Sequence, residues 1–177
     1  MRKYTKKLLN ISSKVKLVAT DIDGVLTSGE VILLENSEEI KIWNVKDRLG
    51  MHLLKQYLPE VKVAWITGRK SKQVELRAKE QKVDFLVQSC QDKIKSLLDI
   101  ANNMSISLEE VAYIGDDIID LGILKKVGLS VCPLDAVIEA KKASKYISQY
   151  YGGKGVFREV CEILLKSRNM WNEIIKK

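Results

Sequence analysis

The sequence predicts an α/β protein: a Rossmann-like, doubly wound parallel sheet with helices on both faces and a small β-hairpin inserted after the first strand. Two observations predict this fold class. Short apolar runs alternate with amphipathic segments along the 177 residues, and this alternation favours a parallel sheet covered on both faces. Residues 29–45 instead contain two β-rich runs around a polar turn, which is typical of a hairpin.

The first half of the chain has three apolar runs that are predicted to form strands. Residues 15–21 form a short apolar run that ends in an acid, and residues 61–68 and 83–88 repeat the pattern of an apolar run bounded by turn residues. Hydrophobic residues recur at helical spacing in the segments between these runs. This periodicity predicts helices over residues 47–58 and 71–81.

The second half of the chain continues the alternation. Aspartate caps helices well, so Asp92 is expected to begin a helix over residues 92–104, and residues 107–117 form a turn that enters a fourth strand. A short helix over residues 118–127 and a fifth strand over residues 128–133 follow. The last two expected elements are helices, at residues 134–144 and at about 155–176. Because no Ser/Gly-rich linker and no repeat divides the sequence, residues 1–177 are expected to form a single domain.

Composition and charge pattern indicate the cell compartment and the classes of partner that are not expected. The net charge is +7, but the lysines are spread along the chain without interleaved aromatic residues, so a solvated basic surface is expected rather than nucleic-acid binding. No apolar run approaches the length of a membrane span, and residues 1–14 lack the apolar core of a secretory signal. Cys90, Cys132 and Cys161 are an odd number without CxxC spacing. They indicate a reducing compartment, the cytoplasm, rather than disulfides or a zinc site.

Polar side chains follow the apolar runs, at the point where each expected strand ends. They are Asp21 and Asp23 after the first run, Thr67, Gly68 and Arg69 after the second, Asp92 and Lys93 after the third, and Gly115, Asp116, Asp117 and Asp120 after the fourth. The carboxyl ends of parallel strands share one edge of the sheet, which is where ligands bind in such folds. We therefore expect these side chains to meet there.

The chemistry of this set indicates phosphoryl transfer. Several carboxylates in one place repel one another unless a cation neutralises them, and oxygen ligands without His or Cys favour Mg²⁺. A threonine hydroxyl, a lysine and the amides of a glycine-containing loop bind phosphate. Together they suit transfer through an aspartyl-phosphate, with a second acid that protonates the leaving alcohol and then activates water.

Four segments resemble the motifs of the haloacid dehalogenase superfamily of phosphatases: "DIDGVLT", "ITGR", Lys93 and "GDDIID". Further segments, among them "NVKDRLG" and "GGKGVFREVCE", extend the resemblance over residues 15–167 to the small-cap members that hydrolyse 3-deoxy-D-manno-octulosonate 8-phosphate in lipopolysaccharide precursor synthesis. This resemblance implies a Mg²⁺-dependent enzyme without a large cap domain. It also implies a homotetramer, in which the hairpin meets neighbouring subunits and helps to close the site.

The resemblance also implies roles for individual residues. Asp21 is the expected nucleophile, and Asp23 is the expected general acid and base. Thr67 and Lys93 hold the phosphate. The expected metal ligands are Asp21, Asp23 through its backbone carbonyl, and Asp116, with Asp117 ordering the groups around them. Asp120 is interpreted equally well as a helix-start acid that the helix dipole favours.

The expected substrate-binding residues are Arg69, Lys46, Thr27, Gly68 and Arg158. Arg69 is interpreted as the partner of the sugar-acid carboxylate, because guanidinium groups bind carboxylates in a fork. Asp47 either lines the substrate site or begins a helix. In relatives the tail approaches a neighbouring active site, so the resemblance makes Lys154 and Arg158 candidates for substrate contact there. Relatives usually have a glycine and then a small or aromatic residue where this chain has Arg48 and Leu49.

Three alternatives remain open from the sequence. The substrate is an eight-carbon sugar-acid phosphate or a nine-carbon one, and Arg69 favours the eight-carbon acid because relatives of the other kind can carry an acid there. A phospho-accepting receiver domain of a signalling system also combines an acid cluster, Mg²⁺, a threonine and a lysine on such a sheet. A non-catalytic oligomerisation module is the third alternative, although every expected catalytic residue is present.

Overall fold

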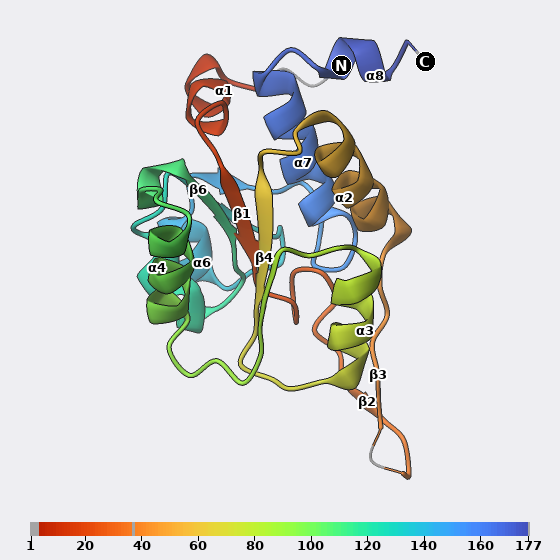
Figure 1. Cartoon of the computed structure of the whole chain (residues 1–177). Coiled ribbons are helices and arrows are strands. Elements are labelled where there is room, and N and C mark those ends of the chain that lie inside the picture. The colour runs from red at the N-terminus through yellow and green to blue at the C-terminus, as the bar shows by residue number, and fades with distance from the viewer. Residues whose placement is uncertain (1–3, 37, 177) are drawn as a thin grey trace.

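The computed structural model describes residues 4–36 and 38–176, and its centre is a six-stranded sheet whose neighbouring strands all run parallel. In spatial order the strands are β5 (Phe85–Val87), β4 (Lys62–Ile66), β1 (Leu17–Thr20), β6 (Val111–Ile114), β7 (Leu129–Cys132) and β8 (Tyr146–Ile147). Figure 1 shows β1 and β4 side by side at the centre. After β5 the chain crosses back to pair β6 with the other side of β1, so the topological switch point lies between β1 and β6.

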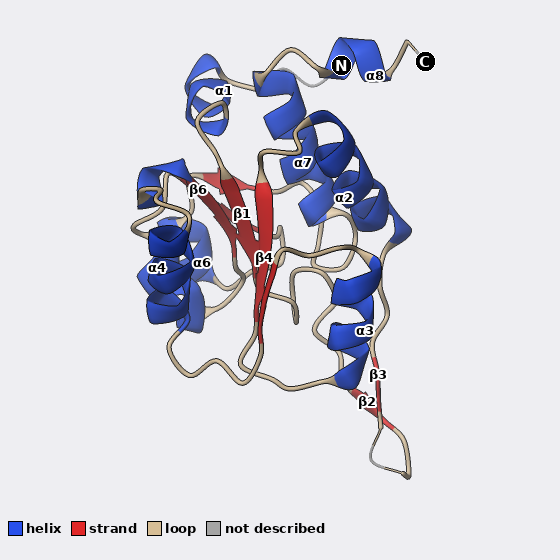
Figure 2. Cartoon of the chain, viewed as in Figure 1, coloured by secondary structure: helices blue, strands red, loops and turns tan. Residues whose placement is uncertain are grey.

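Helices cover both faces of the sheet (Figure 2). One face carries α1 (Lys6–Ser12), α2 (Val45–Tyr57), α3 (Lys72–Glu80) and α7 (Val156–Ser167). The other carries α4 (Lys93–Asn103), α5 (Leu121–Leu124) and α6 (Ile138–Ala143), and two single 3₁₀ turns, η1 (Leu108–Glu110) and η2 (Ile118–Asp120), flank β6. The predicted fold class, a doubly wound parallel sheet with helices on both faces, is confirmed.

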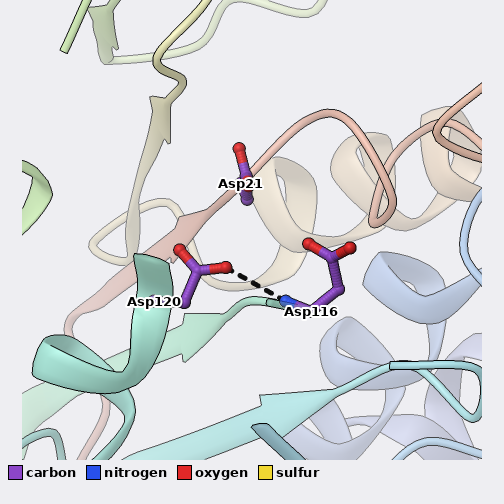
Figure 3. Close-up of side chains that lie close together, drawn as sticks. All are labelled: Asp21, Asp116 and Asp120. Atoms are coloured by element: carbon purple, nitrogen blue, oxygen red, sulfur yellow. Dashed lines mark hydrogen bonds between the residues drawn. The ribbon is translucent and has the colours of Figure 1, made fainter. Parts of the chain in front are cut away.

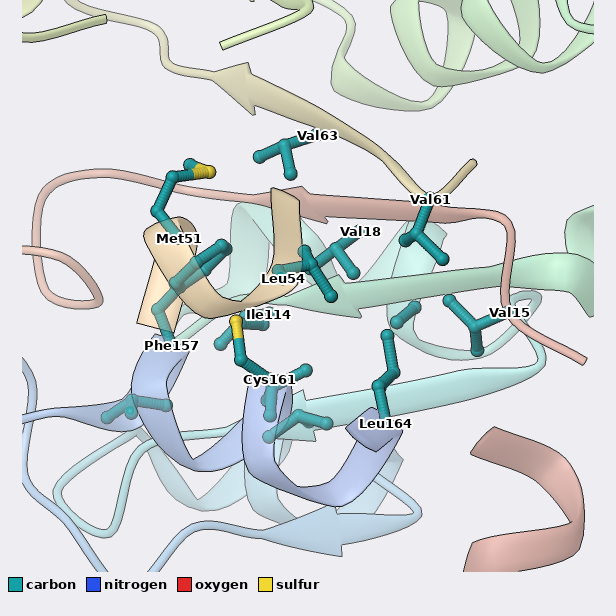
Figure 4. Packing of buried hydrophobic residues seen from close by; sticks show 14 of the residues in the cluster. Val15, Val18, Met51, Leu54, Val61, Val63, Ile114, Phe157, Cys161 and Leu164 are labelled. Atoms are coloured by element: carbon teal, nitrogen blue, oxygen red, sulfur yellow. The ribbon is translucent and has the colours of Figure 1, made fainter. Parts of the chain in front are cut away.

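Alternate side chains of β1 enter two hydrophobic cores. Val18 lies in the core on the α2 and α7 side, whereas Leu17 and Ala19 lie in the core on the opposite face. Figure 4 shows the first core, where Leu54 of α2 and Phe157 of α7 gather over the sheet. Complete burial of all four residues of β1 explains why this strand reads as a continuous apolar run.

The inserted hairpin is much shorter than its sequence signal. Its strands β2 (Ile32–Leu33) and β3 (Glu39–Ile40) pair antiparallel over two residues each. Figure 1 shows this hairpin projecting from the body of the molecule near α3. Few backbone hydrogen bonds hold it, so its position depends on the side-chain contacts described below.

Three elements differ from the sequence expectations. A helix, α1, forms in the N-terminal segment because Thr5 caps it by accepting the Leu8 N–H, and β8 adds a sixth strand that is only two residues long. The single C-terminal helix expected over about 155–176 was wrong. It is observed as α7 and a separate α8 (Trp171–Ile174), because Asn169 adopts a left-handed backbone with φ 60°.

Within the part of the chain that the structure describes, no helix is both long enough and apolar enough to cross a membrane.

Candidate active site

Three aspartates meet where β1 and β6 end, at the topological switch point. Asp21 follows β1 directly, Asp116 lies just beyond β6, and Asp120 closes η2. One carboxylate oxygen of each lies within 4.8 Å of the others. Figure 3 shows the three carboxyl groups around one space, with the Asp120 carboxylate accepting the Asp116 backbone N–H at 3.1 Å. The expected convergence of strand-end acids is therefore observed.

Lys93 forms ion pairs with two carboxylates of this cluster. It is the first residue of α4, which Asp92 caps by accepting the Lys95 N–H at 3.0 Å. Its buried ammonium donates to Asp21 Oδ2 at 2.7 Å and to Asp120 Oδ1 at 2.8 Å. Burial disfavours the charged ammonium, but the carboxylates of Asp21 and Asp120 outweigh that effect, so the pKa of Lys93 lies above its usual value.

Asp120 is therefore not a simple helix-start acid. Its side chain is fully buried, and in addition to Lys93 it accepts the Tyr113 hydroxyl at 2.7 Å. Its other oxygen accepts the Asp116 N–H. With these bonds Asp120 orients both Lys93 and the backbone that carries Asp116. No sequence signal distinguishes this arrangement from an exposed helix-start acid, because the partners come from three different elements.

The electrostatics of the cluster favour a bound cation. Burial raises the pKa of Asp21 to about 6 against the opposing charge of Lys93, and burial together with the charges of Asp21 and Asp120 raises that of Asp116 to about 7. Asp116 Oδ1 is buried and has no hydrogen-bond partner among the described residues. An all-carboxylate donor set with an unpaired oxygen fits Mg²⁺, and Asp21 and Asp116 are the side chains placed to hold it.

Gly24 leaves room beside Asp116. A Cβ at this position would lie 2.1 Å from Asp116 Oδ2, and the Gly24 φ of +88° is one that other residues rarely adopt. The segment after β1, residues 21–28, is called the β1 loop below. It lines a surface cleft together with residues that follow β6 and β7, and its lining residues include Asp23, Gly24, Ser28, Asp116, Asp117 and Asp135.

A second group of alternating charges surrounds Asp23. Lys41, which directly follows β3 of the hairpin, forms an ion pair with Asp23 Oδ1 and with Glu39 Oε1. Arg69, just beyond β4, donates to Glu39 Oε2 at 2.7 Å, and its Nε lies 3.9 Å from Asp23 Oδ2. These contacts bring the hairpin onto the catalytic edge. The sequence analysis missed Glu39 and Lys41, whose only signal is their alternation with Ile40 and Ile42.

The residues after β4 form a compact loop. Thr67 is buried, and its Oγ1 accepts the Arg69 N–H at 3.1 Å, which leaves the hydroxyl hydrogen free to donate. The Thr67 N–H donates to Val87 O, and the Cys90 N–H donates to Thr67 O, so the loop is fastened to the end of β5. Thr67 and Gly68 thus lie at the same edge of the sheet as Asp21, beside β1.

Two expected site residues, Asp117 and Thr27, form hydrogen bonds within their own loops. The Asp117 carboxylate accepts the Ile118 N–H and so caps η2, although the residue also lines the cleft. Thr27 is buried, with its hydroxyl bonded to the Ile22 carbonyl of its own loop, so it supports the β1 loop.

The two expected cations of the helical layer also lie outside the carboxylate cluster. The Lys46 ammonium lies 5.8 Å from the centroid of the Tyr150 ring. The Arg158 guanidinium lies 4.9 Å from the Trp171 ring centroid and 3.7 Å from the Glu162 carboxylate. Within this chain Lys46 lies near Tyr150, in the loop after β8, and Arg158 lies near Trp171 of α8 and Glu162 of α7.

The "GGKG" segment supports the β1 loop of the same chain. Gly153 donates its N–H to Val25 O at 2.9 Å, and its carbonyl accepts Asn44 Nδ2 at 2.8 Å. A Cβ at Gly152 would lie 2.1 Å from the Gly24 carbonyl oxygen. Only a glycine permits this approach, so the segment is more than a flexible lead-in to α7.

Taken together, fold and site have the arrangement of a phosphoryl-transfer protein. The buried carboxylate of Asp21 ends the central strand, a lysine neutralises it, and further acids provide a site for a divalent cation.

Comparison with known proteins agrees with this class. A family model described as haloacid dehalogenase-like hydrolase matches residues 70–160. The 3-deoxy-D-manno-octulosonate 8-phosphate phosphatase KdsC of Escherichia coli strain K12 is 36% identical over 162 residues, which are 92% of this chain and 85% of that protein.

Two solved structures of phosphatases with the same name are also similar. The Moraxella catarrhalis structure, in complex with a magnesium ion, a phosphate ion and a KDO molecule, is 34% identical with a TM-score of 0.93 and covers 98% of both chains. The Yersinia pestis structure is 32% identical with a TM-score of 0.92 and covers 96% of this chain and 90% of that one.

The chain belongs to the haloacid dehalogenase-like hydrolases and, among them, to the family of the 3-deoxy-D-manno-octulosonate 8-phosphate phosphatases. The protein is therefore a phosphoric monoester hydrolase. This membership excludes the receiver-domain alternative, since receivers are signalling switches and not hydrolases.

Proposed function

We propose that this protein is a Mg²⁺-dependent phosphatase that hydrolyses 3-deoxy-D-manno-octulosonate 8-phosphate to the free sugar acid and phosphate, a step in lipopolysaccharide precursor synthesis. The observation that carries the proposal is the buried Asp21–Lys93 pair beside Asp116, in a chain 36% identical to a phosphatase of that specificity. The Moraxella catarrhalis relative supports the same cofactor and product, since its structure holds magnesium, phosphate and KDO.

The proposed mechanism has two steps, both in line at phosphorus. In the first, an Asp21 carboxylate oxygen attacks the phosphorus, the bond from phosphorus to the sugar oxygen breaks, and Asp23 gives its proton to that oxygen. In the second, Asp23 takes a proton from a water molecule that attacks the aspartyl-phosphate, which releases phosphate and regenerates Asp21. Bound Mg²⁺ supplies positive charge that offsets the carboxylates and the phosphoryl oxygens.

Different residues around the nucleophile bind the phosphate and the carboxylate of the substrate. Lys93 neutralises Asp21 and the entering phosphate, and the Thr67 hydroxyl and Gly68 amide donate to phosphoryl oxygens. Arg69, held by Glu39 and partly exposed, offers its remaining N–H groups to the sugar-acid carboxylate. Asp23 and Asp116 complete the metal site with Asp21, the former through its backbone carbonyl.

The test is phosphate release from 3-deoxy-D-manno-octulosonate 8-phosphate, a nine-carbon analogue and simple sugar phosphates, each with Mg²⁺ or with EDTA. Mg²⁺-dependent release that is fastest from the eight-carbon compound is expected, and Asp21→Asn should abolish it. Faster release from the nine-carbon analogue would transfer the proposal to that substrate. A chain that releases phosphate from none of them, with Mg²⁺ present, refutes the proposal.

We further propose that the protein is a cytoplasmic homotetramer of single-domain subunits, residues 1–177, assembled through the hairpin. Large apolar side chains are exposed along the hairpin and at the start of α2: Val31, Ile32, Leu33, Leu34, Ile40, Ile42, Val45 and Leu49. A concentration of exposed large apolar side chains in one segment is typical of an interface. Light scattering behind size exclusion should give four subunits. Leu33→Lys, at a position that is 67% exposed, should lower that number, and a monomeric wild type refutes the assembly.

A further inference from the structure

Lys41 is a buried cation whose recorded partners are both acids, and it lies outside the strand-end motifs. Although it sits on a projecting hairpin, its side chain is only 2% exposed. Its ammonium lies between Asp23 Oδ1 and Glu39 Oε1. A lysine loses much rotamer freedom and hydration when it is buried in this way, so the position is unusual for a surface hairpin.

The two oxygens of the Asp23 carboxylate have different surroundings. Oδ1 is taken by Lys41, whereas Oδ2 is buried and has no hydrogen-bond partner among the described residues. Arg69 Nε lies 3.9 Å from Oδ2, beyond hydrogen-bond distance. One oxygen is therefore fixed and the other remains available to a bound molecule.

Asp23 needs such an external anchor. It lies in the β1 loop, outside any regular strand or helix, so neighbouring backbone does not fix its side chain as a strand would. Lys41 itself is fixed through Glu39, which also accepts Arg69 at 2.7 Å. Arg69, beyond β4, therefore contacts Glu39 of the hairpin. Glu39 contacts Lys41, and Lys41 in turn contacts Asp23.

We propose that Lys41 is a positioning residue that holds the Asp23 carboxyl group in place, so that its free oxygen, when it carries a proton, can give that proton to the leaving oxygen of the substrate; this rests on the proposed role of Asp23 as general acid. Lys41 acts through Asp23 and does not touch the reacting atoms. Small displacements of a catalytic group are costly, since a shift of about 1 Å can slow a reaction on the order of 10²-fold.

The test compares two substrates that differ in their need for an acid. A sugar phosphate releases an alkoxide that must be protonated, whereas p-nitrophenyl phosphate releases a stable phenolate. For both, kcat/KM reports formation of the aspartyl-phosphate. Lys41→Met should lower kcat/KM for the sugar phosphate on the order of 10²-fold and leave p-nitrophenyl phosphate nearly unchanged. Lys41→Arg, which keeps the charge, should restore part of the loss.

Three controls accompany these measurements, all on the full chain with Mg²⁺. Asp23→Asn should give the same selective loss, and the Asp23→Asn/Lys41→Met double variant should lose no more than Asp23→Asn alone, because both changes remove one function. Lys16→Met removes another lysine that pairs with an acid, Glu110 at 2.6 Å, at the opposite edge of the sheet. It should leave both rates unchanged.

The outcomes separate this proposal from the proposed function. Equal losses for both substrates would make Lys41 a structural support of the hairpin or a binding charge, and no loss for either would give it no role; both results overturn the inference. If Lys41→Met does not fold, as judged by its thermal unfolding, Lys41→Arg takes its place with the same selective pattern required. A wild type that hydrolyses neither substrate overturns the proposed function instead.

Discussion

Replacing Asp47 by Asn should raise the free energy of unfolding at neutral pH and leave it unchanged below about pH 3. Asp47 lies in the first turn of α2, and its Oδ1 accepts the Arg158 N–H at the start of α7 at 2.8 Å. Its Oδ2 is buried without a hydrogen-bond partner among the described residues. Burial raises the pKa of Asp47 to about 6, although the Arg158 contact and the charge of Lys46 oppose the rise.

The sign follows from proton binding in the two states. Below about pH 3 the carboxyl group is protonated in both states and does not change the stability. As the pH rises from 3.8 to about 6, the unfolded chain loses this proton first, so the native state becomes less stable. Above that range the buried charge lowers the stability by at most about 3 kcal/mol. Asn keeps the acceptor for Arg158 and never ionises, so it avoids this loss.

The assay is urea unfolding of wild type and Asp47→Asn between about pH 4 and about pH 8, with the exposed Asp99→Asn as the matched control. Asp21 and Asp116 titrate in every variant, so the difference from wild type isolates Asp47. The stability gain of Asp47→Asn should grow from a small value near pH 4 to a plateau near pH 8, and this plateau should exceed any gain from the exposed Asp99→Asn. Parallel profiles for wild type and Asp47→Asn would refute the reasoning.

The remaining predictions concern the support of the site. Gly152→Ala places a Cβ 2.1 Å from a carbonyl oxygen of the β1 loop and should lower stability by about 1–3 kcal/mol together with kcat, whereas Gly122→Ala, whose Cβ would have 4.0 Å of clearance, should lower neither. Asp120→Asn turns an amide N–H toward the Asp116 N–H and should raise the Mg²⁺ concentration for half-maximal activity about 10- to 100-fold. Arg69→Ala should raise KM for the sugar-acid phosphate about 10- to 100-fold and leave KM for p-nitrophenyl phosphate, which has no carboxylate, unchanged.

The sheet and the strand-end acids could be predicted because both follow from local pattern. A fully buried strand such as β1 must be a short apolar run, and its carboxyl end must lie at the ligand-binding edge. Asp21 and Asp116 were therefore predictable from position alone. In contrast, β8 has two residues and too little pattern to recognise.

The supporting contacts could not be predicted, because each joins segments far apart in sequence. Asp120 reaches back to Lys93, Lys41 to Asp23, and Gly152 to the β1 loop. The hydrophobic periodicity of a segment does not indicate which distant segment its side chains contact. The same reason applies to the contact of the Arg158 guanidinium with the Trp171 ring within this chain.

In residues 39–42 of the hairpin the charged side chains are largely buried and the apolar ones are exposed. This reversal links the proposed assembly to the proposed role of Lys41. From residue 39 to residue 42, charged and apolar side chains alternate, but the charged ones turn inward: Lys41 is 2% exposed, whereas Ile42 is 64% exposed. An isolated hairpin would place the isoleucines inside and the charges in water. The inversion is stable only if acids receive the charges on one side and another surface covers the apolar side chains on the other. Asp23 and Glu39 meet the first condition within this chain, and a neighbouring subunit would meet the second. Assembly and the position of the general acid are then coupled through the same few residues.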